Sequence, residues 1–223
     1  QELKIYFKFC ESKELDELYA RFHESLTKYR SHNKEIDQIF LTLHGLLFDL
    51  GECFEVHETY LNKIKILERK ISELSKDFES SSKQVKDIIN RFYSIFENLE
   101  DSGSPKLKAL ISELELNENS KTLLLVRSNQ TAGYLKGIVR NNVYVRTFNS
   151  FATESSEDFD KIICLGWPNS IRFGKFWHQH LSKEIYFLGY VFENHRFKRF
   201  LRSYDGLHGR LIKESSDPDW FSK

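Results

Sequence analysis

One heptad repeat runs without a phase shift through residues 15–99, and it constrains the fold of this chain more than any other feature of the sequence. Apolar residues recur at alternating spacings of three and four, the pattern by which a helix keeps one side against a neighbouring helix. The a and d positions are Leu15, Leu18, Phe22, Ser25, Tyr29, His32, Ile36, Ile39, Leu43, Leu46, Leu50, Cys53, His57, Tyr60, Ile64, Leu67, Ile71, Leu74, Phe78, Ser81, Val85, Ile88, Phe92, Ile95 and Leu99. This register predicts that the first half of the chain is helical.

Two helical architectures fit this register. One continuous helix through these residues would be on the order of 125 Å long. Breaks at residues 31–33 and 80–82, with Asn33 as an N-cap, would instead fold three helices back into an antiparallel bundle or hairpin. Apolar e positions widen the stripe and favour the folded-back form. They are Phe40, Leu47, Phe54, Leu61, Ile89 and Phe96. A homodimer through the seam stays open as an alternative.

Local sequence signals set the limits of this helical part. Residues 3–9 alternate and are rich in strand formers, so they predict a short strand or a tail left from a preceding domain. The Asp-Ser-Gly-Ser-Pro motif at residues 101–105 predicts a firm helix end. We therefore place a coiled-coil-like helical arm at residues 1–104 and a small α/β domain at residues 105–223.

The two halves of the chain differ in charge although the whole sequence is neutral. Residues 1–103 contain 15 Lys and Arg against 20 Asp and Glu, a net charge of −5. Residues 121–213 contain 15 against 7, a net charge of +8. A basic part beside an acidic helical part predicts that the second half meets phosphate. Because charges of both signs are interspersed, solubility alone also explains the asymmetry.

The cysteine spacing and the lengths of the apolar runs indicate the cellular compartment in which we expect the protein. Cys10, Cys53 and Cys164 are far apart and odd in number, which argues against a disulfide framework or a zinc ribbon and suits a reducing cytoplasm. No apolar run approaches the roughly 20 residues of a membrane span, so we expect no membrane contact. Because the sequence contains no Met, not even an initiator, we expect a fragment of a larger protein.

Strands and helices are predicted to alternate in the second half, after a helix at residues 106–114. Short apolar runs predict strands at residues 122–126, 143–148, 159–165 and 185–190. Helices are expected at residues 128–140, 170–183 and 192–201. This alternation predicts a small Rossmann-like α/β domain with a parallel sheet and right-handed crossovers.

Two segments of this domain carry a family resemblance. The first is the apolar strand at residues 123–126 that leads into Ser128, Asn129 and Gln130. The second is Phe-Asp-Lys-Ile-Ile-Cys-Leu-Gly-Trp-Pro-Asn-Ser at residues 159–170. Together they resemble the second RecA-like lobe of superfamily 1 and 2 helicases, over residues 121–201. The resemblance implies a RecA-like fold with a nucleic-acid surface, and a link to helicase-related proteins of bacterial antiphage defence.

The ATPase motifs of that family are missing from this sequence. No G-x-x-x-x-G-K-[ST] phosphate loop occurs, so no set of backbone amides and lysine is arranged to hold a triphosphate. The family's Gln-x-x-Gly-Arg-x-Gly-Arg segment is also missing, and Phe-Trp-His-Gln-His-Leu stands in that region, at residues 176–181. The resemblance therefore implies a degenerate lobe without ATPase chemistry of its own, and we expect no cofactor and no catalytic residue.

Other groups of reactive residues are interpreted as structural. His178 and His180 are two apart on a predicted helix, so their side chains face different ways and do not converge on a metal ion. The acidic cluster at residues 154–160 has no downstream E-x-K arrangement of the kind a nuclease would use, so Asp160 is interpreted as the start of a strand. Cys164 lies inside an apolar strand and is expected in the core. We therefore expect no metal site.

Basic residues are the better candidates for a functional site. The helix predicted at residues 192–201 interleaves Arg and Lys with Phe197 and Phe200. Arginine binds phosphate through its planar guanidinium and stacks on bases, and aromatic rings add stacking. The candidate nucleic-acid-binding residues are Arg127, Arg172, Arg196, Lys198, Arg199, Arg202 and Arg210. The alternative is that these charges only solubilise the surface above an apolar core.

These observations lead to one expected function and two alternatives. We expect a non-catalytic nucleic-acid-binding or helper lobe of a larger helicase-like protein, which contacts the phosphate backbone through its basic C-terminal surface, with DNA favoured over RNA. Its helical arm would contact the rest of the parent protein or a protein partner. The first alternative is a structural or oligomerisation module that docks a partner through that arm. The second is a hydrolase or nuclease of unrecognised type.

Overall fold

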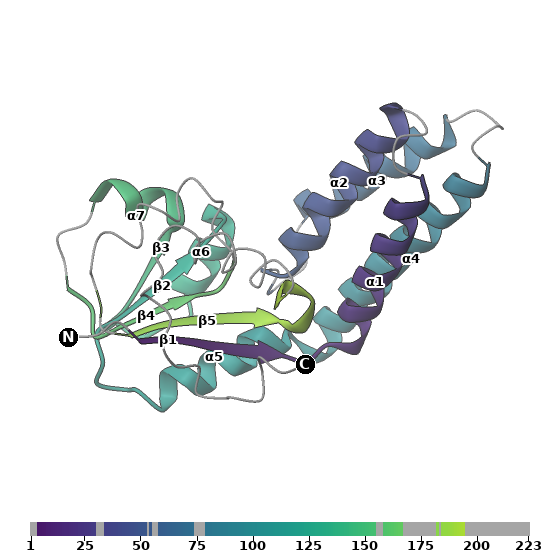
Figure 1. The fold of residues 1–223 in the computed structure, drawn as a ribbon. Helices are drawn as coiled ribbons and strands as arrows, with labels where there is room; N and C mark the ends of the chain where they lie inside the picture. Colours follow the sequence, from purple (N-terminus) through teal and green to yellow (C-terminus); the bar gives the residue numbers. More distant parts are fainter. Residues whose placement is uncertain are drawn as a thin grey trace, which may run out of the picture. The chain divides into compact units, whose positions relative to one another are not determined.

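A computed structural model of the chain describes residues 4–29, 34–52, 54, 58–73, 79–154, 158–166, 182 and 184–194. The chain forms two compact units (Figure 1). The α/β unit consists of Gln1–Cys10 and Lys106–Lys223, and the helical unit consists of Glu11–Pro105. The sequence placed residues 1–10 with the helical arm. The structure differs there, because β1 (Lys4–Cys10) pairs with the last strand of the α/β unit. The helical unit is therefore an insertion within the α/β unit.

Four helices make up the described part of the helical unit. They are α1 (Lys13–Tyr29), α2 (Lys34–Leu50), α3 (Glu58–Ser72) and α4 (Glu79–Ser102). Consecutive helices run in opposite directions (Figure 1), and both α1 and α3 pack against α2 and α4. The folded-back arrangement is thus confirmed and the single continuous helix is wrong. The expected number of three helices is also wrong. No described helix is both long enough and apolar enough to cross a membrane.

The apolar stripe forms the core of this unit. Residues at the a and d positions such as Leu18, Leu43 and Ile64 are buried. The e-position residues Phe40 and Ile89 are buried as well. The helices α2 and α4 therefore pack on more than one side, as the width of the stripe predicts.

The helix ends differ from the expected breaks in two places. The chain turns at Gly51 and Glu52, inside a stretch that the sequence indicated as one helix. The expected break at residues 80–82 is wrong, since these serines lie near the start of α4. Serine is tolerated well in a first helical turn, so a run of serines there does not interrupt the helix. The expected break at residues 31–33 falls between α1 and α2, but its cap Asn33 lies outside the described residues.

The stop at residues 101–105 is confirmed. The helix α4 ends at Ser102, and Gly103 has φ 70, a left-handed conformation that glycine adopts without the cost of a side chain. Pro105 then opens α5 (Pro105–Glu115), where its missing N–H removes no helical hydrogen bond.

The α/β unit is built on a parallel five-stranded sheet with the order β1-β5-β4-β2-β3. Its other strands are β2 (Thr122–Val126), β3 (Val143–Thr147), β4 (Lys161–Cys164) and β5 (Glu184–Tyr190). The short helices are α6 (Asn129–Lys136), α7 (Phe148–Glu154) and the 3₁₀ turn η2 (Val191–Glu193). The predicted α/β fold with a parallel sheet is confirmed, and so are its four predicted strands.

The helices of the α/β unit differ in extent and in number from those that the sequence predicts. The helix expected at residues 128–140 ends earlier, at Lys136, because Gly137 caps it. The helix α7 was not predicted. The helix expected at residues 170–183 lies outside the described residues except for Ser182, which is in no helix, and so does most of the one expected at residues 192–201.

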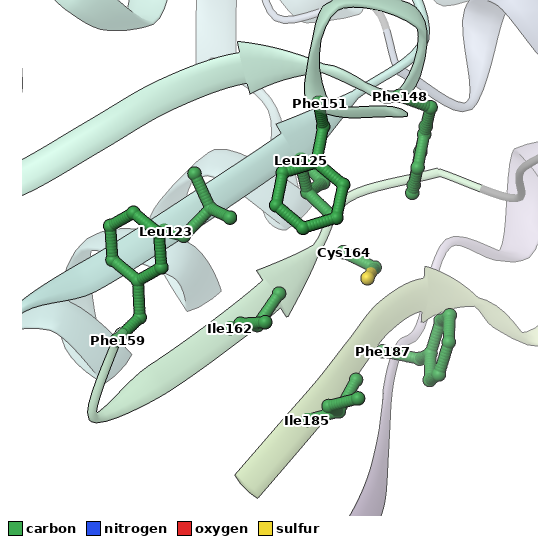
Figure 2. Packing of buried hydrophobic residues seen from close by; sticks show 9 residues of the cluster. All are labelled: Leu123, Leu125, Phe148, Phe151, Phe159, Ile162, Cys164, Ile185 and Phe187. Carbon is green, nitrogen blue, oxygen red and sulfur yellow. The ribbon is translucent and has the colours of Figure 1, made fainter. Parts of the chain in front are cut away.

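One face of the sheet packs against α7 (Figure 2). Leu125, Ile162 and Phe187 from three neighbouring strands meet Phe148 and Phe151 in one buried cluster. Because β3 and β4 flank β2 on opposite sides, right-handed crossovers place α6 and α7 on opposite faces of the sheet.

On the other face, α5 is held by a buried carboxylate that two lysines share. Glu113 of α5 accepts hydrogen bonds from Lys8 of β1 and from Lys161 at the start of β4. Lys161 is 4% exposed and Glu113 is 7% exposed. The Lys161 Nζ atom also lies 3.7 Å from the centre of the Tyr186 ring. Buried charges are stable only when they are paired, so this contact fixes where α5 crosses the sheet.

The lysines also set the ionisation of this carboxyl group. Burial alone raises the pKa of Glu113, but the hydrogen bonds and charges of Lys161 and Lys8 outweigh burial. The net result is a lowered pKa, so Glu113 is ionised at neutral pH.

Two glycine substitutions are expected to change stability in opposite directions. The Gly103→Ala variant should lose about 1 kcal/mol of unfolding free energy, because alanine is strained at positive φ. The Gly45→Ala variant should gain about 0.5–1 kcal/mol, because Gly45 lies inside α2 and an added Cβ there meets no neighbouring element. Urea denaturation of both variants measures this, and shifts of the same sign would contradict the argument.

Loss of the Glu113 charge is expected to destabilise the α/β unit. The Glu113→Gln variant should lose about 3–5 kcal/mol of unfolding free energy, because Lys161 stays buried without its counter-charge. The matched control is Glu118→Gln, which breaks an exposed ion pair with Arg140 and should cost less than about 1 kcal/mol. Equal losses in the two variants, measured by denaturant unfolding, would disprove a special role for Glu113.

Lowering the pH is expected to remove the stabilisation that the ionised Glu113 side chain provides. The pKa of Glu113 is lower in the folded state than in the unfolded chain, where it is near 4.5. The stabilisation is therefore complete above the unfolded pKa and is lost as the pH falls through the lower folded pKa. Unfolding free energies measured from neutral pH down to about pH 3 should fall more steeply for the parent protein than for Glu113→Gln. Parallel curves would contradict this assignment.

Candidate functional site

The strand order of the sheet defines one position where a ligand site is expected. From β2 the chain first moves outward to β3, and it then crosses back to β4 on the other side. In open parallel sheets, ligands bind beyond the carboxyl ends of the strands at such a reversal. The carboxyl ends of β2 and β4 are therefore the candidate site in this fold.

Arg127 and the start of α6 occupy this position. Arg127 follows directly after β2 and is exposed. Ser128 is the N-cap of α6, and its side-chain oxygen accepts the N–H of Thr131 at 3.0 Å. The first-turn N–H groups of a helix have no partner within the helix, and they attract anions together with the helix dipole. A guanidinium and a helix N-terminus thus lie in adjacent positions of the sequence at the carboxyl end of β2.

Hydrogen bonds also define the carboxyl ends of the two strands beside β2, which are β3 and β4. After β3, the N–H of Thr147 donates to Ser150 Oγ and the N–H of Ser150 donates to Thr147 Oγ1, both at 3.2 Å. This reciprocal pair starts α7 without an intervening loop. After β4, the N–H of Leu165 donates to the Leu125 carbonyl at 2.9 Å, which extends the pairing of β4 with β2. The Ser/Thr spacing of three residues at Thr147 and Ser150 is the signal by which the sequence could have indicated α7.

Among the seven candidate nucleic-acid-binding residues, the structure describes Arg127. The other six lie outside the described residues: Arg172, Arg196, Lys198, Arg199, Arg202 and Arg210. Arg140 precedes β3, at the amino ends of the strands, and pairs with Glu118 at 2.8 Å. Arg140 therefore does not belong to the carboxyl-end site, but it supplies a matched arginine for experiments.

The other reactive groups have structural roles where they are described. Asp160 accepts the backbone N–H of Lys121 at 2.8 Å and lies at the start of β4, as its structural interpretation predicts. His178 and His180 lie outside the described residues. Within the part of the chain that the structure describes, no three His, Cys, Asp or Glu side chains gather as a metal site would require.

Cys164 belongs to the core, as predicted. It is 1% exposed within the cluster of Figure 2, and burial raises the pKa of its thiol well above the usual value. A thiol in that environment stays protonated and is a poor nucleophile. The thiol of Cys10, at the end of β1, also has a raised pKa because burial outweighs the charge of Lys106.

A groove on the α5 face has a different character from the carboxyl-end site. It has a volume of about 190 Å³ and lies between α5 and residues 138–143. Leu110, Leu114 and Val139 are among its apolar lining residues, and Glu118 and Arg140 also line it. Because its arginine is paired with Glu118 and its remaining charged lining residue, Glu115, is acidic, this groove is poorly suited to phosphate.

Comparisons with known proteins give a likeness to solved structures and none to a family or curated protein. No model of a protein family matches the chain, and no curated protein matches it. Among solved structures, the chain is similar to the crystal structure of the Pyrococcus furiosus Hef helicase domain, with a TM-score of 0.47 and 15% sequence identity. The alignment covers 89% of this chain and 57% of that chain. This chain therefore spans less than two thirds of the length of the helicase domain that it matches.

Proposed function

We propose that the α/β unit binds the phosphate backbone of nucleic acid at the carboxyl ends of β2 and β4. In this proposal the chain is a non-catalytic helper lobe of a larger helicase-like protein, with DNA favoured over RNA. The observation that carries the proposal is the placement of Arg127 beside the N-terminus of α6 at the reversal of strand order. The helicase part of the proposal comes from the sequence resemblance over residues 121–201, and the association with antiphage defence stays a prediction from that resemblance.

The chemistry at this position suits a phosphate diester. A guanidinium donates two parallel hydrogen bonds to phosphate oxygens, and backbone N–H groups at a helix N-terminus donate to the same kind of acceptor. Contacts of this type position a strand without reading its bases. The expected binding is therefore independent of base sequence and sensitive to salt.

The charge distribution supports the same proposal. Residues 121–213 carry a net charge of +8, and the six candidate basic residues outside the described part belong to this region. Several phosphate contacts spread over such a region would add to affinity, because each contact releases counterions from the nucleic acid. The missing phosphate loop supports a helper role without triphosphate hydrolysis of its own.

The direct test is binding of short single-stranded and double-stranded DNA, and of RNA with the same sequence, at two salt concentrations. We expect submicromolar binding to DNA at low salt that weakens steeply as salt rises. Absence of binding at low salt would reject the proposal. If the chain does not bind nucleic acid and is a firm dimer by light scattering, the structural or oligomerisation module becomes the favoured function.

A single arginine substitution tests the proposed position. The Arg127→Ala variant should weaken DNA binding by a similar factor for unrelated sequences, and should reduce the slope of log affinity against log salt by about 1. The matched control is Arg140→Ala at the amino ends of the strands, which should leave both the affinity and the slope nearly unchanged. Equal effects of the two variants would show that binding depends on net charge and does not depend on this site.

A further inference from the structure

We propose that the ion pair between Lys106 and Glu193 couples the point where the chain re-enters the α/β unit to the turn that follows β5. A conformational change at either point is then transmitted to the other. The proposal concerns a conformational device within the α/β unit. It does not depend on nucleic-acid binding.

Lys106 is the first residue of the α/β unit after the helical insertion. It lies in the first turn of α5, and its side chain is 0% exposed. The Nζ atom donates to Glu193 Oε2 at 2.9 Å and lies 5.3 Å from the centre of the Tyr190 ring. Displacing this lysine from Glu193 would break an ion pair of a wholly buried charge, which is costly, so the pair restrains the position of the first turn of α5.

Glu193 connects this lysine to the end of β5. Its Oε2 atom also accepts the backbone N–H of Tyr190, at 2.7 Å, so the carboxylate holds the turn η2 against the strand. Gly189 makes this approach feasible, because a Cβ at that position would lie only 3.1 Å from the same oxygen. One carboxylate oxygen therefore contacts both the last residue of β5 and the first turn of α5.

Both connections to the helical insertion reach the same strand end. The chain leaves the α/β unit at Cys10, whose register partner in β5 is Tyr190. It returns at Lys106, which lies against the Tyr190 ring. Two residues before α5, Gly103 has its positive φ, so the returning segment has a defined turn immediately before the ion pair. Movement of either connection thus acts on Tyr190 and on the turn that follows it.

This arrangement is better suited to coupling than to stabilisation. Two charges withdrawn from water gain little net stability over a well-packed apolar pair, whereas loss of one partner is costly. Separation of the pair would leave buried charge uncompensated, so the two segments that carry Lys106 and Glu193 are expected to move together.

Hydrogen exchange of the full chain, followed by mass spectrometry, tests the coupling. In both Lys106→Met and Glu193→Gln, we expect exchange to rise at least about tenfold at residues 189–193 and also at residues 103–108. Glu118→Gln, which breaks an exposed pair in the same unit, is the control and should change neither segment. A rise confined to the segment that carries the substitution would overturn the proposal.

The double variant separates coupling from general loss of structure. If the residues act as a unit, Lys106→Met should add little to the exchange at residues 189–193 once Glu193→Gln is present. Multiplicative effects of the two substitutions would overturn the proposal. Glu193→Gln keeps the size of the side chain and an acceptor for the Tyr190 N–H, so it reports on the charge even if Lys106→Met lowers the folded fraction.

Discussion

The architecture of the α/β unit depends on one buried carboxylate. Glu113 joins α5 to β1 and β4, which are separated by one strand in the sheet and are far apart in the sequence. Apolar packing alone would allow α5 to slide along the sheet, because burial of apolar surface is not directional. Two lysines on one carboxylate have a preferred geometry, and together with the Lys106–Glu193 pair they define both the position and the direction of the helix.

Local patterns explain which parts of the fold could be predicted. The strand β2 and the cap Ser128 were predictable because an apolar run, a capping residue and a helix follow one another within a few residues. The role of β1 was not, because Lys4 pairs with Glu184, and no local pattern indicates a partner at that separation. Arg127 could be named as a candidate from the sequence because it is a basic residue directly after a strand. Its place at the reversal of strand order could not, because that depends on the order of the whole sheet.

The heptad repeat shows how a correct pattern can hide a turn. The connection between Leu50 and Glu58 contains the seven residues 51–57, which is the length of one repeat. The apolar residues keep their phase across this connection, as they do across the shorter ones at residues 30–33 and 73–78, so the register alone cannot separate one long helix from several antiparallel ones. Gly51 was the available local signal, since glycine after an apolar helix commonly marks its end.

The position of β1 has a consequence for synthesis on the ribosome. Residues 11–105 can form their helices and local contacts as they emerge, but β1 has no partner until β5 has been made. At translation rates of about 5–20 residues per second, that interval is on the order of ten to forty seconds. During it, a segment with Tyr6, Phe7 and Phe9 presents unpaired strand edges. The β1 segment of the nascent chain is therefore expected to need chaperone protection long after the helices have folded.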